Sequence, residues 1–472
     1  MEATDRIARI AFALLCLGFA VGFLAFPTYP NYDSYYSLLW GREVVDLATP
    51  VFEGFRIPTE HPLAIAVGAI LGLFGHVGDR LFVGLILASY LWLVWGVYRL
   101  ARISFTAVVG GIAVLLLLTR FDFTFLAARG YIDVPYMALV VWAAVLEAAR
   151  PRRGAPVLLL LAAAGLLRPE GWVLAGLYWL WLVPRATWRQ RARYAALAAI
   201  GPVLWCGVDL AVTGNPLFSL LYTSGSAEDL GRSRPLSQLP STLPEFFGLL
   251  LKVPVELLAI AGIAFAAVAV PRRMAMPFVL FASGLATFVL IGAAGASVIE
   301  RYLAVAAVAL IVFAGVALGG WTMLERSAAR RIWAVAAIAF VIGGAAFTAT
   351  RLDLGYFDNE LSFRGAAHRD LASVLASAPV RRGLRCGPLT VPNHKLVPDS
   401  RWIAGLPADR VIARADPKAP RPGRGVAIVV TSRFAIFKHA WTSPSDDPRI
   451  QLPPPGFERR VTTRFYAAYV RC

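Results

Sequence analysis

The chain has 472 residues, of which 58% are hydrophobic and only 16% charged, and its formal net charge is +17. So few polar side chains cannot cover a soluble protein of this length, and the sequence therefore predicts a polytopic α-helical membrane protein. The apolar runs are continuous rather than alternating, which argues against a β-barrel. The positive charge does not indicate nucleic acid as a partner. Only four of the 46 basic residues are Lys, and many Arg residues lie in short loops where they set membrane topology.

Eleven apolar runs are candidate membrane spans. They are residues 7–27, 81–98, 104–119, 134–149, 156–167, 172–184, 194–213, 248–270, 277–294, 301–319 and 332–350. No small-residue cleavage site follows the first run, so we interpret it as a retained anchor rather than a signal peptide. With a cytoplasmic N-terminus, the Arg clusters fall in the short cytoplasmic turns, as the positive-inside rule requires.

The shorter apolar run 62–74 would reverse this charge pattern if it crossed the membrane. We therefore interpret it as a re-entrant or interfacial helix within the first outer loop. Eleven spans then leave the C-terminus outside the cell, and the expected location is a bacterial plasma membrane. The outer face receives residues 28–80, 120–133, 168–171, 214–247, 295–300 and the tail after 351.

Pro, Arg and Asp become more frequent after about residue 351, and the apolar runs shorten. The sequence predicts a transmembrane domain over 1–350 and a small extracytoplasmic α/β domain over 351–472. Within the latter we expect a helix at 364–378 and strands at 384–391, 426–431 and 461–470.

The four Cys residues divide between these two parts of the chain. Cys16 and Cys206 lie in apolar runs and are expected to be small core residues. Cys386 and Cys472 lie in the polar C-terminal part, where an outside location would let them form a disulfide. Nothing in the sequence places these two close together.

Two acidic residues stand at the predicted outer face. Asp33 lies in an aromatic loop, NYDSYYSLLWG (31–41), between Tyr32 and Tyr35. A carboxylate there can accept a proton from an attacking hydroxyl while aromatic rings stack on a sugar. The alternative is an ordinary interfacial aromatic belt. Asp133 follows Arg129 in RGYIDVPYMAL (129–139), where it is either a helix N-cap, a functional acid, or both.

Charged residues in the other outer segments are candidates for substrate contacts. FEGFRIPTEHPL (52–63) carries Arg56, Glu60 and His61, which could meet a phosphate or act as acid or base. The alternative for this segment is an N-terminal cap of the short apolar helix. In LLRPEGW (166–172), Arg168 and Glu170 form either a structural pair or part of a substrate cavity.

Two further Arg residues lie in outer loops. Arg232 belongs to a long loop (213–235) and could neutralise a lipid phosphate or simply be solvated. Arg301, in IERYLA (299–304), could bind phosphate or pair with Glu300.

The order of these segments resembles the C-type glycosyltransferase superfamily, near the aminoarabinose transferases and protein O-mannosyltransferases. The resemblance covers residues 1–350 and is carried by YDSYYSLLWG, PTEHPL, YIDVPYMAL, RPEGW, TGNPLFS and ERYL. It implies an outward-opening cavity with Asp33 as general base and Asp133 as a second acidic contributor. The chain departs from the family pattern at Glu60-His61-Pro62, where relatives have Lys-Pro-Pro. The family's Lys contact to phosphate would then fall to Arg56, His61 or Arg301, or the substrate differs.

The resemblance implies transfer of a sugar from a polyprenyl-phosphate donor to a glycan, lipid or protein acceptor of the cell envelope. The expected partners are therefore this donor, its acceptor and membrane lipids, with no nucleic acid. The sequence marks no definite cofactor, and the pair of acids is compatible with a divalent cation without demanding one. A polar-lipid transporter or flippase is the first alternative, and a non-catalytic scaffold of envelope assembly is the second. The sugar, the acceptor, the polyprenyl length and the oligomeric state are not encoded in any recognisable motif.

Overall fold

The structure is a computed structural model that describes residues 2–229, 234, 236–295, 297–351, 353–440 and 447–472. Its contacts divide the chain into two compact units. The helical unit comprises Met1–Gly22, His61–Leu63 and Leu85–Leu354, and the mixed unit comprises Phe23–Glu60, Ala64–Gly84 and Gly355–Cys472. The mixed unit thus joins most of the segment that follows the first predicted span to the C-terminal part of the chain.

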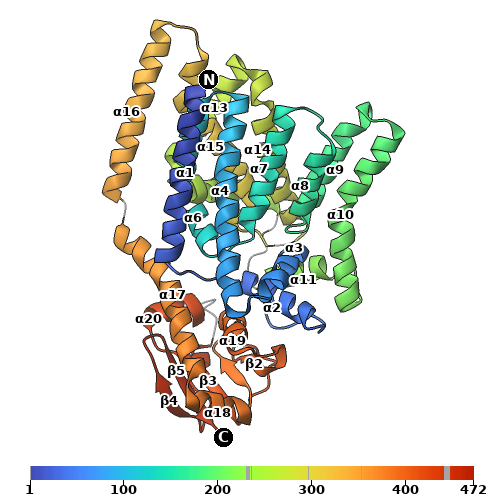
Figure 1. The fold of residues 1–472 in the computed structure, drawn as a ribbon, viewed down its shortest axis with the longest axis vertical. Coiled ribbons are helices and arrows are strands. Elements are labelled where there is room, and N and C mark those ends of the chain that lie inside the picture. Colours follow the sequence, from blue (N-terminus) through green and yellow to red (C-terminus); the bar gives the residue numbers. More distant parts are fainter. Residues whose placement is uncertain (1, 230–233, 235, 296, 352, 441–446) are drawn as a thin grey trace. The chain divides into compact units, whose positions relative to one another are not determined.

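Helix α15 (Ala304–Gly319) is the central element of the helical unit. All but one of its 16 residues are buried, and it packs against α5, α13 and α14. A helix that is apolar on every side is stable in such a position because its backbone is satisfied internally and neighbours cover every face. Helices α8, α9 and α10 lie side by side in the same unit (Figure 1).

The remaining helices of this unit follow in chain order, and the boundary between the units falls within α1, α3 and α4. Their bounds are α1 (Glu2–Ala25), α4 (Gly78–Ser104), α5 (Ala107–Leu118), α6 (Phe121–Ala128), α7 (Asp133–Ala149), α8 (Ala155–Gly165), α9 (Glu170–Leu182), α10 (Trp188–Thr213), α11 (Phe218–Asp229), α12 (Leu239–Leu251), α13 (Val253–Ala269), α14 (Pro271–Ala293) and α16 (Ala328–Arg351).

Six helices within the described residues are long and apolar enough to cross a membrane, or up to eight spans if each of two bent pairs counts as one, by length and composition. The bends are 65° between α5 and α6 and 106° between α12 and α13. A helix occupies most of each of the eleven predicted runs. However, α7, α8 and α9 have only 17, 11 and 13 residues, whereas an upright span needs about 20. The chain is therefore an integral membrane protein, and some of its described helices in the predicted runs are shorter than a full upright span.

The segment around Asp33 is a helix, α2 (Tyr32–Val45), rather than the predicted loop. The Asn31 side chain caps it by accepting a hydrogen bond from the Ser34 N–H at 3.0 Å. The loop prediction was wrong. Most of α2 is buried, so its sequence lacks the one-sided apolar stripe by which a helix can be predicted. The short helix predicted at 62–74 is confirmed as α3 (Pro62–Gly72), whose 11 residues are too few to cross a bilayer.

A five-stranded sheet in the order β2-β1-β3-β5-β4 lies in the mixed unit. The strands are β1 (Leu389–Val391), β2 (Val411–Ala413), β3 (Gly425–Val430), β4 (Glu458–Thr462) and β5 (Tyr466–Arg471). β1 pairs in parallel with β2 and β3, whereas β5 pairs antiparallel with β3 and β4. The predicted strand at 426–431 is confirmed as β3. The prediction of one strand at 461–470 was wrong because a turn divides it into the hairpin β4–β5, and β1 is shorter than the predicted 384–391.

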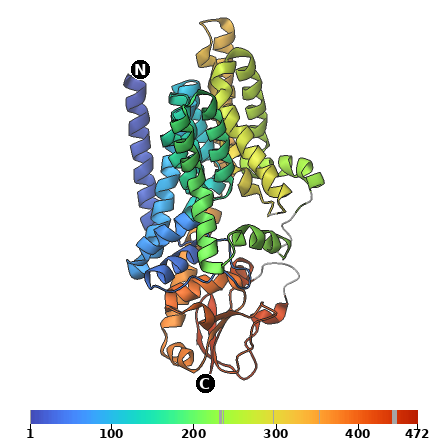
Figure 2. The same cartoon turned by 90° about the vertical axis from the view of Figure 1, so that its right-hand side faces the viewer.

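Helices α17 (Leu354–Ala376) and α18 (Ala378–Cys386) pack on this sheet, and α19 (Val397–Ala404) packs on α2 and β2 (Figures 1 and 2). One short helix, α20 (Arg433–Ala435), follows β3. The core combines Leu371 and Val374 of α17 with Val426 and Ile428 of β3. Apolar side chains of a helix face and of alternate strand positions thus bury one another, which drives this α/β arrangement.

The chain's last residue is covalently tied to the mixed unit. Cys386 at the end of α18 forms a disulfide with Cys472, and their Cα atoms lie 5.4 Å apart. The pairing that the sequence left open is therefore formed. Cys16 and Cys206 are free thiols.

Helices α2 and α3 cross at two glycines, Gly41 and Gly68. A Cβ atom at Gly41 would lie 2.2 Å from the Ala69 backbone N, and one at Gly68 would lie 2.5 Å from the Ser37 backbone O. Real Cβ atoms do not approach backbone so closely, so either helix would have to move.

We expect Gly41→Ala to lower the free energy of unfolding of the mixed unit by about 1–3 kcal/mol through this overpacking. Gly72→Ala on α3 is the matched control, because its Cβ would meet nothing nearer than 3.8 Å. Thermal unfolding of the purified variants measures the difference. Equal unfolding temperatures for the two variants would contradict the close crossing.

Candidate functional site in the helical unit

Four charged residues of the helical unit, far apart in sequence, lie together and form what we call the Asp133 cluster: Asp133, Arg168, Glu170 and Arg301. Asp133 is the first residue of α7, and Glu170 is the first residue of α9. Arg168 lies in the turn between α8 and α9. Arg301 lies in a 3-10 turn, Glu300–Leu303, directly before α15.

The turn that presents Arg168 and Glu170 is tight for a local reason. A Cβ atom on Gly171 would lie 2.4 Å from the Gly165 backbone N, so only glycine lets α8 and α9 approach this closely. Pro169 immediately precedes α9, a position where its missing N–H costs no helix hydrogen bond. The sequence RPEGW therefore holds its two charges at a fixed place between the two helices.

Arg168 is the centre of the Asp133 cluster. Its Nη1 donates to Asp133 Oδ1 at 2.5 Å, while Nη2 and Nε donate to Glu170 Oε1 at 2.6 and 2.9 Å. The aromatic ring of Tyr302 covers the guanidinium, with 4.1 Å from Arg168 Cζ to the ring centroid. Arg301 Nη1 lies 3.7 Å from the other carboxylate oxygen of Asp133. Asp133 is therefore shared between two cations.

Burial makes this arrangement costly unless its charges are matched. The side chains of Arg168, Asp133 and Glu170 are only 10%, 5% and 8% exposed, whereas Arg301 is 22% exposed. The two carboxylates balance the two guanidinium groups, so the cluster is formally neutral. Charges within the apolar part of a membrane protein are retained mainly where they serve a function.

The cavity beside the Asp133 cluster is small, about 10 Å³, which is room for about one water molecule. Its wall includes Tyr136 and Tyr302 as well as the four charged residues. Arg301 is the most exposed of the four charged residues and the more distant of the two arginines from Asp133. The donor set does not fit a divalent cation, since Arg168 lies between the two carboxylates. Among the residues that the structure describes, no three His, Cys, Asp or Glu side chains converge as a metal site.

His61 is near the Arg168 turn. The Leu63 N–H donates to the Leu166 carbonyl at 3.1 Å, which ties the start of α3 to that turn. The half-buried His61 ring meets the Trp205 ring edge-on, with centroids 5.8 Å apart. Arg129, at the C-terminal end of α6, lies over Phe125 at 5.6 Å from the ring centroid. Arg232 is outside the described residues.

Five of the predicted residues belong to the mixed unit, namely Tyr32, Asp33, Tyr35, Arg56 and Glu60. Glu60 is buried. Asp33 is half-buried in the first turn of α2, and Tyr32 beside it meets the His394 ring edge-on at 5.4 Å. Tyr35 is fully buried, and its hydroxyl donates to Asp79 at 3.0 Å. Arg56 adopts a positive φ of 54°, an uncommon conformation for a residue with a side chain. The Asp133 cluster thus contains four of the predicted residues, and Asp33 belongs to the other unit.

Sequence reasoning predicted the Arg168–Glu170 pair, but it missed Tyr302 and Tyr136. Tyr302 follows Arg301 directly, and an aromatic residue next to a cation was the available signal. It also missed two polar residues of the mixed unit that no motif marks, the buried Asp79 and the half-buried His368.

No family model matches the sequence, and no curated protein sequence matches it. Solved structures do match it in fold. ArnT from Cupriavidus metallidurans in the apo state aligns with a TM-score of 0.57 and 17% identity, over 99% of this chain and 98% of that one. The Archaeoglobus fulgidus oligosaccharyltransferase in complex with Zn and sulfate aligns with a TM-score of 0.48 and 14% identity, over 82% of this chain and 58% of that one. The alignment with ArnT over nearly the whole length of both chains shows an ArnT-like fold, which agrees with the fold that the sequence motifs predicted.

Proposed function

We propose that the protein is a membrane glycosyltransferase that moves a sugar from a polyprenyl-phosphate donor to an acceptor of the cell envelope. The observation that carries the proposal is the buried Asp133 cluster, two arginines and two carboxylates held in the apolar unit of a glycosyltransferase fold. An ion pair that only stabilised the helices would be replaceable by apolar side chains. A paired but reorganisable set of arginines suits a substrate that brings its own negative charge.

Arg301 is the proposed ligand of the donor phosphate. The Arg301 side chain is 22% exposed, whereas Arg168 is 10% exposed and binds both Asp133 and Glu170, so Arg301 is the more accessible of the two cations. Its guanidinium lies 5.2 Å from the Tyr131 ring centroid, which can keep its plane oriented. When the sugar leaves, negative charge builds up on the polyprenyl phosphate. A fixed guanidinium at that oxygen favours the transition state over the ground state.

Asp33 is the proposed general base. Asp133 is less suited to this role because its side chain is only 5% exposed, whereas Asp33 is half-buried. In the proposed step, the acceptor oxygen attacks the anomeric carbon and its proton passes to Asp33. The bond from the anomeric carbon to the phosphate oxygen breaks, and the electron pair leaves with the polyprenyl phosphate. Proton transfer is needed only as the attacking hydroxyl becomes acidic, so a carboxylate is basic enough.

The proposed reaction face is extracytoplasmic. Arg clusters in the short turns favour a cytoplasmic N-terminus. The Cys386–Cys472 disulfide supports placing the C-terminal part in an oxidising compartment, because disulfides are rare in the cytosol. The acceptor would then be a glycan, lipid or protein of the envelope.

The test is a mass-spectrometric comparison of envelope glycans and polyprenyl-phosphate sugars in a deletion strain. The strain is complemented with the wild type, Asp33→Asn, Arg301→Gln or Asp122→Asn. We expect the deletion to lose one sugar and accumulate its lipid donor, and only the wild type and Asp122→Asn to restore it. Loss of a general base or a charge-stabilising donor lowers turnover about 100-fold or more. Asp122 is the matched control, since it is an exposed acid in the first turn of α6.

If no glycan or donor changes in any strain, the transferase proposal fails in favour of a transporter or scaffold. If Asp33→Asn restores the glycan fully while Arg301→Gln does not, the base is wrongly assigned but the reaction stands.

A further inference from the structure

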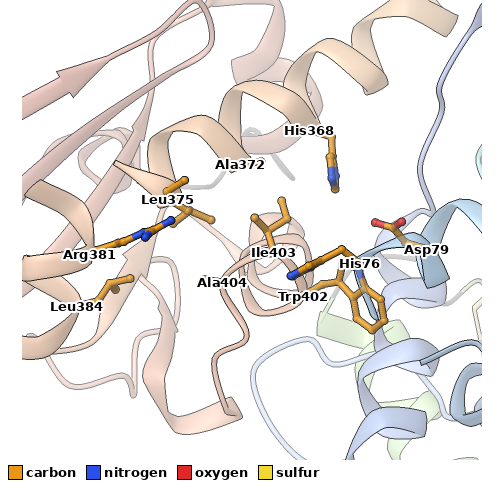
Figure 3. Close-up of a pocket in the computed structure, with 11 residues that line it drawn as sticks. His76, Asp79, His368, Ala372, Leu375, Arg381, Leu384, Trp402, Ile403 and Ala404 are labelled. Atoms are coloured by element: carbon orange, nitrogen blue, oxygen red, sulfur yellow. The ribbon is translucent and has the colours of Figure 1, made fainter. Parts of the chain in front are cut away.

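The mixed unit contains a cavity of about 570 Å³ that the proposed transfer step does not use. This volume is within the range of about 300–1,000 Å³ that is usual for small-molecule sites. Figure 3 shows Asp79 and His76 at one end, Arg381 and Leu384 at the other, and His368 pointing from α17 into the space between. The remaining lining residues are Ala372, Leu375, Ala376, Trp402, Ile403 and Ala404.

A chain of hydrogen bonds fixes the chemistry of the first end. The Tyr35 hydroxyl donates to Asp79 Oδ2 at 3.0 Å. The Tyr35 hydroxyl oxygen also lies 3.2 Å from His368 Nδ1. A phenol has one proton, so His368 Nδ1 must be the donor in the second contact. Nε2 of a neutral His368 is then a hydrogen-bond acceptor. This end of the cavity therefore offers acceptors, an imidazole nitrogen and a carboxylate, and it favours a ligand with neighbouring hydroxyl donors.

The surroundings argue against a cationic ligand at this end. Burial, together with the nearby Arg364 and Arg369 cations, lowers the pKa of His368 to about 3, so the ring is neutral at ordinary pH. The positive charge of these arginines would offset the attraction of the Asp79 carboxylate for an ammonium group. Tyr29 stacks on the His368 ring at 3.6 Å between centroids, which holds the ring in place. Hydroxyl groups of a neutral sugar ring meet these conditions.

The rest of the wall suits a sugar that also carries an acid. Trp402 offers an aromatic surface, against which the apolar C–H face of a sugar can pack. Arg381, at the opposite end from Asp79, presents a guanidinium, which binds carboxylates through paired hydrogen bonds. The short apolar side chains between the two ends leave no long apolar channel of the kind that a lipid tail requires.

We propose that this cavity binds an acidic saccharide unit, with its hydroxyl groups at Asp79 and His368 and its carboxylate at Arg381. On the proposed function, this unit is part of the acceptor that receives the sugar. The mixed unit would thus select acceptors by their charge, separately from the donor phosphate at Arg301.

The test is a saturation-transfer NMR titration of the full-length protein in nanodiscs with two disaccharides. Cellobiouronic acid carries the carboxylate, and cellobiose is the matched neutral sugar. We expect the acidic disaccharide to bind about tenfold more tightly, because its carboxylate makes a charge-assisted hydrogen bond to Arg381 that the neutral sugar cannot make. Arg381→Gln should abolish this preference, whereas Arg382→Gln should keep it. Both arginines are exposed on α18, and only Arg381 lines the cavity.

A third variant, His368→Phe, keeps a ring against Tyr29 but removes the acceptor nitrogen, and it should weaken both disaccharides alike. Unfolding temperatures confirm that each variant is folded. Equal affinity for the two sugars, no binding of either, or the same loss in Arg381→Gln and Arg382→Gln would overturn the proposal. Binding is read without turnover, so the outcome is distinct from that of the glycan analysis. If the acidic disaccharide binds but the deletion strain shows no change in envelope glycans, the saccharide site is supported and the transferase proposal is rejected. If the glycans change but neither disaccharide binds, only the saccharide site is rejected.

Discussion

Replacing Arg168 with methionine is expected to lower the free energy of unfolding of the helical unit by about 3–5 kcal/mol. Arg168 is the shared partner of Asp133 and Glu170, whose side chains are only 5% and 8% exposed. Its loss would leave two carboxylates in an apolar setting with one remaining cation, Arg301. Removing one partner of a buried ion pair lowers stability far more than replacing the whole pair with apolar side chains, because it leaves an unpaired buried charge.

Thermal unfolding in nanodiscs measures this effect. Arg129→Met is the matched control, since Arg129 is a half-buried arginine of the same unit that lies over Phe125. The triple variant Arg168→Met, Asp133→Asn, Glu170→Gln removes all three charges and should recover most of the stability. It should still fail to transfer sugar, which separates a functional cluster from a structural one. An Arg168→Met protein as stable as Arg129→Met would show that the ion pairs do not hold these helices together.

The apolar runs predicted where the helices lie but not where they break. Hydropathy depends on composition, and it detects neither the 106° bend between α12 and α13 nor the shortness of α8. The bend follows Lys252, which adopts a positive φ of 67°, a conformation that a hydropathy pattern does not register. Helix α2 was missed for the opposite reason, because it is buried by contacts that its own sequence does not reveal.

In the candidate site, contacts between residues close in sequence could be predicted, whereas contacts between distant residues could not. Arg168 and Glu170 are two residues apart, so their pairing could be predicted from spacing alone. The Asp133–Arg168 contact joins residues 35 apart, and Tyr35 and His368 are separated by 333 residues. Contacts of that kind depend on how whole helices pack, and one sequence without related sequences carries no signal for them. The individual site residues could therefore be predicted from the sequence, whereas the arrangement of the Asp133 cluster and the cavity of the mixed unit could not.

Removing the Cys386–Cys472 disulfide should be the second large effect. The two residues are 86 positions apart, and a cross-link that closes so long a loop restricts the unfolded chain strongly. Its loss is expected to cost the mixed unit about 2–5 kcal/mol, near the upper end of that range because the loop is long. The double variant Cys386→Ser, Cys472→Ser should therefore unfold at a lower temperature than the wild type. Cys16→Ser, Cys206→Ser is the matched control, because both thiols are free and lie in the helical unit.

The same cysteines test the proposed orientation in living cells. A maleimide reagent that cannot cross the membrane should label Cys386 and Cys472 only after reduction, because an oxidising compartment keeps them paired. It should not label the Ser double variant at these positions under any condition. Labelling without a reductant would mean that Cys386 and Cys472 are unpaired outside the cell. The stabilisation expected from their disulfide would then be absent in cells. Protection that persists after reduction of the folded protein would instead point to a cytoplasmic C-terminus, and the proposed reaction face would be wrong.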